Sequence, residues 1–461
     1  MLPSLLVSLL SGGTDALAFV LAILITVACG APLGFLLRPK REDLNAQDGM
    51  VVAGLSWAVL SFFGCLPFIL SGAIPHFADA YFETVSGFTT TGATVVKNIE
   101  ALPKGILFWR SFTHWIGGMG VLIFTLALLP RLSGRSAHLA RAESPGPTFT
   151  KLLPRMSDTA KLLYGLYFAL SLIMFVCLLL CGMNCYDALI HTFGTAGTGG
   201  FSNYGASIAA FNSPLIEWVI AVFMLLFGVN FAAYFHLIRK EFKLAAKNEE
   251  VIGYLIIAFA VTLGVTLFIL PQYGNFFVSL RYGFFQVTSI MSTTGFATAD
   301  FNLWPLAAKF LLILVMCIGA CAGSTGGGFK ISRVSLLAKS GYRELQRTLK
   351  PRKVAVVRYD GKTVQESTLS NLGVYLAVYV MILLMGSLLL SIEAPDMTTA
   401  VTSALTCLSN VGPGLNAVGP VENFAFYSPL SKFLMSLLML AGRLEIFPII
   451  SLFIPSVWKK N

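Results

Sequence analysis

Thr89-Thr90-Thr91-Gly92-Ala93-Thr94 is the segment from which the architecture of this chain can be read, because three later segments repeat its design. They are Thr195-Ala196-Gly197-Thr198-Gly199-Gly200-Phe201, Ser292-Thr293-Thr294-Gly295-Phe296-Ala297-Thr298 and Leu408-Ser409-Asn410-Val411-Gly412-Pro413-Gly414. With Gly92, Gly199, Gly295 and Gly412 taken as equivalent, the intervals are 107, 96 and 117 residues. This is a fourfold internal repeat. Glycine lets a backbone turn its carbonyls freely, so four copies around one axis predict a cation-selective pore within a single polypeptide.

The composition is that of a membrane protein. Hydrophobic residues make up 56% of 461 positions and charged residues 12%, which indicates a polytopic membrane protein. The net charge is +10, yet 25 of the 32 Lys and Arg lie in five connecting segments, at 38–49, 131–161, 239–250, 330–362 and 459–461. The positive-inside rule makes these segments cytoplasmic. The charge therefore sets the topology or contacts anionic lipid, and does not indicate nucleic-acid binding.

The predicted fold is an all-α polytopic membrane protein with four pseudo-repeated units around one central pore. Each unit consists of a helix, a re-entrant pore loop and a second helix, because each apolar block starts and ends at a cytoplasmic segment and is longer than two spans require. The predicted organisation is an N-terminal extra helix region, 1–49; pore units at 50–130, 161–238, 251–338 and 371–461; and cytoplasmic linkers at 131–160, 239–250 and 339–370.

Within this organisation the hydrophobic runs predict individual helices. The extra helix is 16–37, and residues 1–12 are too short to span, so they form half of a hairpin, a surface helix or the remnant of a longer segment. The first helices of the units are predicted at 50–73, 161–184, 252–271 and 371–392. The re-entrant helices are predicted at 78–91, 187–198, 277–294 and 397–411, and the second helices at 106–130, 213–238, from 303, and 429–457.

The four loops have the chemistry of an alkali-cation site. A dehydrated cation needs oxygen ligands, which rings of backbone carbonyls supply, and no Asp or Glu adjoins the four glycines, which argues against a divalent cation. The C-terminal end of each re-entrant helix adds partial negative charge. The predicted filter residues are Thr90, Thr91, Gly92, Thr198, Gly199, Thr294, Gly295, Val411 and Gly412. Asp187 and Asp396 begin two re-entrant helices and are interpreted as caps, with ion binding as the alternative.

The third unit carries a predicted gate. Its second helix is apolar to about Ile318 and then has five glycines in ten residues, which would unwind a helix. Irregular backbone at membrane depth is tolerated when it is buried or lines a cavity; the alternative is a flexible interfacial turn. Arg443 lies mid-span in the last helix and is interpreted as part of this gate, or as the partner of Glu445. The predicted gate residues are Gly319, Gly323, Ser324, Thr325, Gly326, Gly327, Gly328 and Arg443.

Other features are given structural interpretations. Arg110 is predicted to be an interfacial anchor, and Cys177, Cys181 and Cys185 to be packing residues on one helix face instead of a transition-metal site. Gly328-Phe329-Lys330 does not complete a nucleotide-binding loop, whose spacing is G-x-x-x-x-G-K-[ST]. No enzyme-like constellation and no organic cofactor site are predicted.

Several of these segments resemble the TrkH/TrkG/KtrB/HKT superfamily of potassium transporters, most closely its TrkH branch. The resemblance covers nearly the whole chain and is carried by Ser86–Thr94, Phe108-Trp109-Arg110-Ser111, Trp115–Gly120, Ala142–Pro147, Gly199-Gly200-Phe201-Ser202, Gly323–Gly328 and Asn410–Leu415. One departure lies at the amino terminus, where this chain has room for one extra helix and a fragment. TrkH proteins usually begin with two.

The resemblance implies a potassium uptake subunit of the bacterial inner membrane with one pore per protomer of a homodimer. It implies that K+ is the transported ion, that the four glycines form the filter, and that the broken third-unit helix and Arg443 form the constriction. It also implies a cytosolic nucleotide-binding ring similar to TrkA as the regulatory partner. In plant relatives a serine at the first filter position goes with sodium transport, so Gly92 favours potassium.

Three alternatives remain open from the sequence. A proton- or sodium-coupled potassium symporter would need a titratable or ion-ligating group on the pathway, and the filters contain no acid. A membrane-embedded enzyme or receptor would need a catalytic set or an added soluble domain. A chain that is inert without its ring would serve as a binding platform for it.

Overall fold

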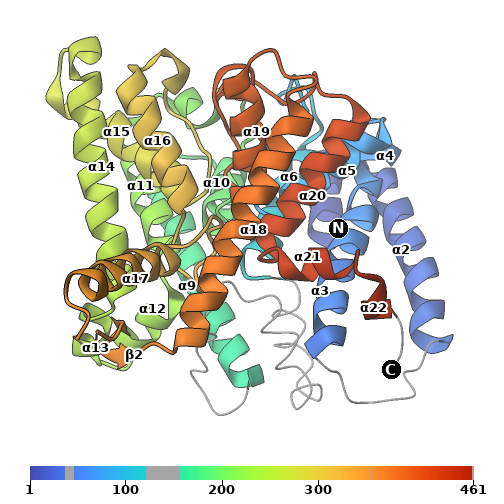
Figure 1. The fold of residues 1–461 in the computed structure, drawn as a ribbon. Helices are drawn as coiled ribbons and strands as arrows, with labels where there is room; N and C mark the ends of the chain where they lie inside the picture. Colours follow the sequence, from blue (N-terminus) through green and yellow to red (C-terminus); the bar gives the residue numbers. More distant parts are fainter. Residues whose placement is uncertain (37–45, 121–155, 353–354, 459–461) are drawn as a thin grey trace.

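The structure, a computed structural model, describes residues 1–36, 46–120, 156–352 and 355–458. Residues 121–130 of the first unit and 131–155 of the first linker, including the motif Ala142–Pro147, lie outside the described residues. The described part is a bundle of helices that run between two ends of the molecule (Figure 1).

The chain begins with a helical hairpin formed by α1 (Leu2–Leu10) and α2 (Ala16–Leu36). Ser8 donates a 2.5 Å hydrogen bond to Asp15, which closes the hairpin. The serine face of α1 is buried against α6 (Lys104–Gly118), while its leucines are exposed. Of the three roles considered for the first twelve residues, the structure therefore shows half of a hairpin.

Each unit then opens with a long apolar helix. These helices are α3 (Ala46–Gly64) continued by α4 (Leu66–Leu70), α9 (Met156–Leu180), α14 (Glu249–Tyr273) and α18 (Glu366–Leu390). The four predicted first spans fall on them. Together with α2 they give five stretches, in the part of the chain that the structure describes, that are long and apolar enough to cross a membrane.

A shorter helix follows in every unit, at the position predicted for the re-entrant segment. These pore helices are α5 (Phe77–Phe88), α10 (Cys185–Ala196), α15 (Phe276–Met291) and α19 (Met397–Ser409). Asp396 caps α19 as expected, accepting a 2.9 Å hydrogen bond from the Thr399 backbone. Asp187 is not the cap of α10: the Asn184 side chain accepts from the Asp187 backbone at 2.8 Å, so Asn184 caps this helix.

The second helices are interrupted in more than one unit. They are α6, α11 (Pro214–Phe227) with α12 (Phe231–Ile238), α16 (Leu306–Ile318), and α20 (Pro429–Arg443) with α21 (Phe447–Ser451). The continuous helices predicted over 213–238 and 429–457 are wrong. α11 and α12 meet at 91°, and Glu445 and Ile446 both have positive φ between α20 and α21. A break predicted for the third unit alone is thus shared by the second and fourth.

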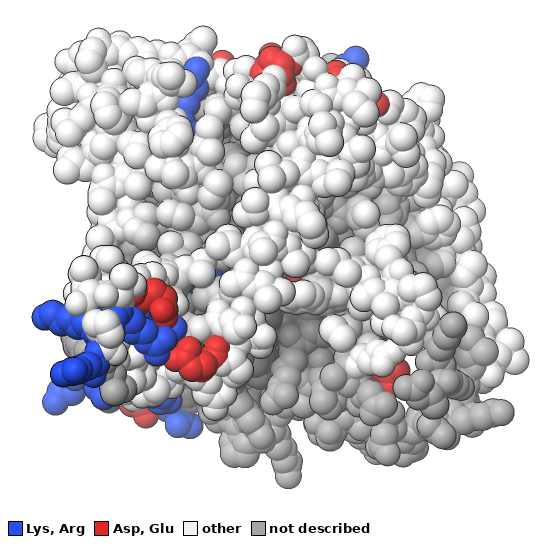
Figure 2. All heavy atoms as spheres, viewed as in Figure 1, with Lys and Arg blue, Asp and Glu red and all other residues white. Residues whose placement is uncertain are grey.

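Basic residues gather at one end of the molecule (Figure 2). This end holds α13 (Phe242–Ala246), α17 (Ile331–Leu349) and a two-stranded hairpin of β1 (Arg358–Tyr359) and β2 (Lys362–Thr363), a small exception to the all-helical expectation. The last described helix is α22 (Pro455–Trp458), and short 3-10 helices η2 (Ser207–Phe211), η3 (Phe301–Leu303) and η4 (Asn416–Val418) follow three of the predicted filter loops. This charge distribution is the one predicted for the cytoplasmic face.

Two apolar clusters form the core between the units. One joins helices of the second and third units, and the other joins the first and fourth. Cys177 and Cys181 pack against the first cluster, and Cys321 is buried within it. These contacts support the packing interpretation of the cysteines. Many large apolar side chains on α9, α14 and α18 point outward, as expected of helices that contact lipid.

Candidate functional site: a ring of four loops above a broken helix

Four three-residue strands, here called the filter strands, follow the pore helices and share one backbone conformation. In each strand the first and third residues have positive φ: Thr90 (55°) and Gly92 (82°), Thr198 (56°) and Gly200 (76°), Thr293 (62°) and Gly295 (83°), Asn410 (55°) and Gly412 (105°). The same left-handed, other, left-handed sequence occurs four times. The fourfold repeat therefore extends to individual backbone angles.

A backbone hydrogen bond fixes the register of these strands. The middle residue donates to the carbonyl five positions earlier in all four: Thr91 to Ser86 (2.9 Å), Gly199 to Gly194 (2.8 Å), Thr294 to Ser289 (2.8 Å) and Val411 to Thr406 (3.0 Å). Gly200, and not Gly199, is therefore the positional equivalent of Gly92, Gly295 and Gly412. The equivalence assumed from the sequence was one residue off in the second unit. Gly199 corresponds to Thr91.

The filter strands close into a ring. A Cβ on Gly92 would overlap the carbonyl oxygen of Gly199; in the same way Gly200 faces the carbonyl of Thr294, Gly295 that of Val411, and Gly412 that of Thr91. Each unit thus presents its glycine to the carbonyl of the next, and the fourth returns to the first. Positive φ and this close approach both require glycine. Gly199 is needed for another reason, since a Cβ there would overlap the buried ring of His114.

Side chains behind the ring are buried and bonded to the backbone. Thr90 and Thr198 donate to the carbonyls of their preceding residues at 2.7 and 2.6 Å. Asn410 joins two units, because its Nδ2 donates to Thr91 Oγ1 at 3.0 Å and to the Met439 carbonyl at 2.9 Å. We had quoted Asn410 only as part of a motif. Its amide now has a defined structural role, holding the fourth filter strand against the first.

The 319–328 loop lies directly beneath two filter strands. The Gly327 backbone donates to Thr293 Oγ1 at 2.6 Å. A Cβ on Gly327 would approach the Ser409 carbonyl at 2.5 Å, and one on Gly326 would approach the Ser292 carbonyl at 2.8 Å. These glycines allow the loop to touch the ends of the third and fourth pore helices. The loop is buried in protein and is not an interfacial turn.

The break between α11 and α12 receives the other side of this loop. Cys321 donates to the Gly228 carbonyl at 3.1 Å, Phe231 donates to the Gly323 carbonyl at 3.0 Å, and Thr325 Oγ1 donates to the Phe227 carbonyl at 3.2 Å. The backbone groups freed by the 91° bend are therefore satisfied by the loop. The sequence analysis missed this contact. Gly228 and Asn230, a breaker and a helix cap, were the available signal.

Arg443 connects the loop to the first unit. Its guanidinium donates to the Thr325 carbonyl at 2.8 Å and to the carbonyls of Gly117 and Gly118 at 2.5 and 2.7 Å. These three acceptors belong to the loop and to the end of α6. Arg443 thus lies where the second helices of units one, three and four approach one another. This is the neighbourhood predicted for it.

Glu445 contacts Arg333 at the start of α17, and the two side chains form an ion pair. Arg333 also lies 4.1 Å from the ring centroid of Tyr375 on α18. The alternative considered for Arg443 was a local pair with Glu445. The contacts of the two residues instead lead in different directions, Arg443 toward the loop and Glu445 toward α17.

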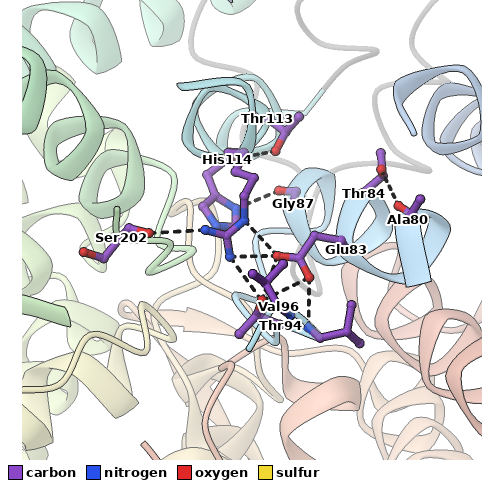
Figure 3. A network of polar contacts seen from close by, with 11 residues as sticks. Ala80, Glu83, Thr84, Gly87, Thr94, Val96, Thr113, His114 and Ser202 are labelled. Atoms are coloured by element: carbon purple, nitrogen blue, oxygen red, sulfur yellow. Dashed lines mark hydrogen bonds and ion pairs between the residues drawn. The ribbon is translucent and has the colours of Figure 1, made fainter. Parts of the chain in front are cut away.

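Arg110 is not an interfacial anchor. Its side chain is 1% exposed and forms a 2.7 Å ion pair with Glu83 of α5, whose side chain is fully buried. Figure 3 shows this network, in which Glu83, Thr94 and Ser202 converge behind the first two filter strands. A buried charge needs a partner, and helix hydropathy alone gave no sign that Glu83 would supply it. This pair was missed from the sequence.

Acids of the outer loops tie each pore helix to the chain that follows its filter strand. Asp187 accepts from Asn203 at 2.8 Å and Tyr204 at 3.1 Å, and Asp396 accepts from Asn416 at 2.9 Å. Farther out, hydrogen bonds from the Ser428 hydroxyl and backbone hold the pKa of Glu393 below its usual value. These bonds stabilise the ionised carboxylate, so their contribution is present at neutral pH and lost as pH falls through the lowered pKa. The structural interpretation of Asp187 and Asp396 is supported.

The sequence model of the TrkH family, described as a cation transport protein, matches residues 16–460. The chain belongs to the TrkH family. A relative named Trk system potassium uptake protein TrkH from Halomonas elongata is 36% identical over 100% of this chain and 96% of its own length. The protein of the same name from Escherichia coli K12 is also 36% identical, over 96% of this chain and 92% of its own.

A solved structure of a TrkH protein has the same fold. The crystal structure of the potassium transporter TrkH from Vibrio parahaemolyticus superposes with a TM-score of 0.88 at 33% identity, covering 99% of this chain and 96% of that one. The resemblance recognised from the motifs is therefore confirmed. Its apolar spans and its family make this chain a multi-pass protein of the bacterial inner membrane.

Proposed function

We propose that this TrkH-family chain takes up potassium through a filter of backbone carbonyls closed from below by the 319–328 loop. The observation that carries the proposal is the closed ring in which the glycine of each filter strand meets the carbonyl of the next. Such a ring offers several oxygen ligands to a dehydrated cation without a formal charge. The relatives from Halomonas elongata and Escherichia coli are named potassium uptake proteins, which supports potassium as the cargo.

Helix ends around the ring favour a cation. Each pore helix ends at the residue just before its filter strand or one or two residues earlier, and so directs its partial negative charge toward it. The carboxylate behind the ring, Glu83, is compensated by Arg110. Selection would then rest on carbonyl number and spacing. The proposed function is transport, with no catalytic residue and no organic cofactor.

The proposed gate has two parts. The loop lies beneath the third and fourth filter strands, and Arg443 places a positive charge beside it while donating to Thr325. A cation leaving the filter would meet both the backbone of the loop and this charge. Opening would require the loop to leave Arg443 and the α11–α12 break.

We extend the proposal to partners on the basis of the resemblance. The protein would act as a homodimer surrounded by membrane lipid, with a TrkA-like nucleotide-binding ring on its basic face. α17 follows the loop directly and carries a 19-residue helix to that face. Movement of α17 by a bound ring would pull on the loop. This arrangement gives a cytosolic partner mechanical access to the gate.

Potassium flux into liposomes that hold the purified protein tests the proposed function. With an imposed potential and equal pH and sodium on both sides, flux is expected to follow the potassium gradient and the potential alone. Flux that starts only when a proton or sodium gradient is added would establish the symporter instead. Addition of the ring to protein that shows no flux distinguishes an inert platform from a protein that does not transport.

Deletion of Gly326-Gly327-Gly328 is expected to raise basal flux, because it removes the part of the loop that touches Thr293 and Ser409. The measurement is potassium flux without the ring, compared with wild type at equal protein density. Deletion of three residues from the exposed 350–352 segment is the matched control. A folded deletion protein with wild-type basal flux would show that the loop does not gate.

A further inference from the structure

A buried ion pair lies behind the first two filter strands, on two different helices. Glu83 is on α5 and Arg110 on α6, with side chains 0% and 1% exposed. Arg110 Nε and Nη2 lie 2.8 and 2.7 Å from Glu83 Oε1. Loss of either partner would leave an uncompensated buried charge. The pair is therefore a fixed part of the structure around the filter.

Glu83 holds the chain as it leaves the first filter strand. Its two carboxylate oxygens accept from Thr94 Oγ1 at 2.9 and 3.1 Å, and Oε2 also accepts from the Val95 backbone at 3.0 Å. Thr94 follows Gly92 by two residues. Hydrogen bonds to an ionised acceptor are the stronger ones in proteins. Both oxygens are thus used to set the position of this strand.

Arg110 reaches the equivalent point of the second strand. Its Nη1 donates to the Ser202 carbonyl at 3.2 Å, and its guanidinium carbon lies 4.0 Å from the Phe201 ring centroid. Its Nη2 also donates to Thr94 Oγ1 at 3.2 Å. Ser202 follows Gly200 by two residues, the same offset as Thr94 from Gly92. One guanidinium therefore spans matching positions of neighbouring filter strands.

The other units place different groups where Glu83 lies. The residue nine positions before the filter glycine is Glu83, His191, Gln286 or Ser403 in the four units. His191 contacts Ser202 Oγ at 3.0 Å, Gln286 contacts Thr298 Oγ1 at 3.4 Å, and Ser403 contacts Tyr427 at 3.0 Å. Of these four positions only the first carries a carboxylate. The support of the ring is therefore unequal, and strongest between its first and second strands.

We propose that Glu83 and Arg110 are positioning residues that fix the spacing of the first and second filter strands and thereby set the ion selectivity of the pore. This inference rests on the proposed function of the ring as a filter. A rigid spacing keeps the carbonyls at the separation that suits one cation size, and looser strands could close on a smaller cation. Selectivity for potassium over sodium would then depend on a pair that does not belong to the filter strands.

The test compares variants that weaken this bridge by different routes. Arg110→Lys keeps the charge next to Glu83 but loses the planar fork that reaches Ser202. Glu83→Gln keeps the shape but removes the carboxylate. The double variant Glu83→Gln with Arg110→Gln leaves no unpaired charge. Each is expected to lower the ratio of potassium to sodium flux in liposomes at least roughly tenfold, which corresponds to about 1.4 kcal/mol.

The matched control is Glu217→Gln. Glu217 forms a 3.0 Å ion pair with Arg281, and their side chains are 6% and 18% exposed. Arg281 precedes Thr293 by twelve residues, so this pair lies far along α15 from the filter strand. The control undergoes the same chemical change and is expected to keep the wild-type flux ratio. Thermal unfolding of each purified variant separates selectivity from stability.

The outcomes separate this inference from the proposed function. Wild-type protein without a preference for potassium would overturn the proposed function. Wild-type protein with that preference, together with any folded Glu83 or Arg110 variant of unchanged ratio, would overturn the inference alone. Failure of all three variants to fold would also overturn it, because the pair would then serve folding and not spacing.

Discussion

Gly92→Ser is expected to lower the potassium-to-sodium flux ratio at least roughly tenfold, the effect of about 1.4 kcal/mol of lost discrimination. Gly92 has φ of 82°, and a Cβ there would overlap the carbonyl oxygen of Gly199 in the neighbouring strand. The second strand would have to move outward, and its carbonyl would leave the ring. The measurement is paired potassium and sodium flux into liposomes.

Gly72→Ser is the matched control for this substitution. Gly72 has φ of 73°, but a Cβ there would meet no atom within 4 Å. A side chain at positive φ costs about 1–3 kcal/mol in either place, so both variants carry the backbone strain and only Gly92→Ser adds the overlap. Equal flux ratios for the two variants and wild type would remove Gly92 from the filter.

Arg443→Ala is expected to raise basal potassium flux roughly tenfold or more. The substitution removes a positive charge and three hydrogen bonds to carbonyls of Thr325, Gly117 and Gly118. Hydrogen bonds that involve a charged group contribute about 1.5–3 kcal/mol each. The loop would therefore lose much of its attachment to α6. The measurement is flux without the ring at fixed potential.

Arg443→Lys separates the two effects of the arginine. Lysine keeps the charge but cannot reach three carbonyls with a planar fork. Low flux in Arg443→Lys would assign the barrier to charge, and flux near that of Arg443→Ala would assign it to the bonds with the loop. A lowered unfolding temperature in Arg443→Ala with unchanged flux would contradict both and leave only a structural role.

The register of the second filter strand shows how far a sequence motif reaches. Gly199 and Gly200 are adjacent, and either one completes the repeat with nearly even spacing. The hydrogen bond from Gly199 to the Gly194 carbonyl and the φ of 76° at Gly200 decide the register. Two glycines in succession carry no mark of which one adopts positive φ. That choice depends on the Thr294 carbonyl, contributed by another unit.

The helix breaks show a second kind of limit. The third-unit loop was predicted because five glycines in ten residues oppose a helix wherever they stand. The break at 228–230 has a single glycine, and a helix can absorb one. It forms there because the Cys321 backbone and the Gly323 carbonyl supply the hydrogen bonds that the bend removes. Such a break depends on its receptor.

The sequence by itself determined the membrane class, the orientation, the four units, the pore helices and the third-unit loop. These follow from hydropathy, charge placement and glycine content, which act locally along the chain. Only the tertiary structure decided which carbonyl faces which glycine, where Arg443 donates and how Glu83 and Arg110 pair. Glu83 and Arg110 are 27 residues apart, and Arg443 and Thr325 are 118 apart. Contacts over such separations depend on how the helices pack, and no local preference encodes them.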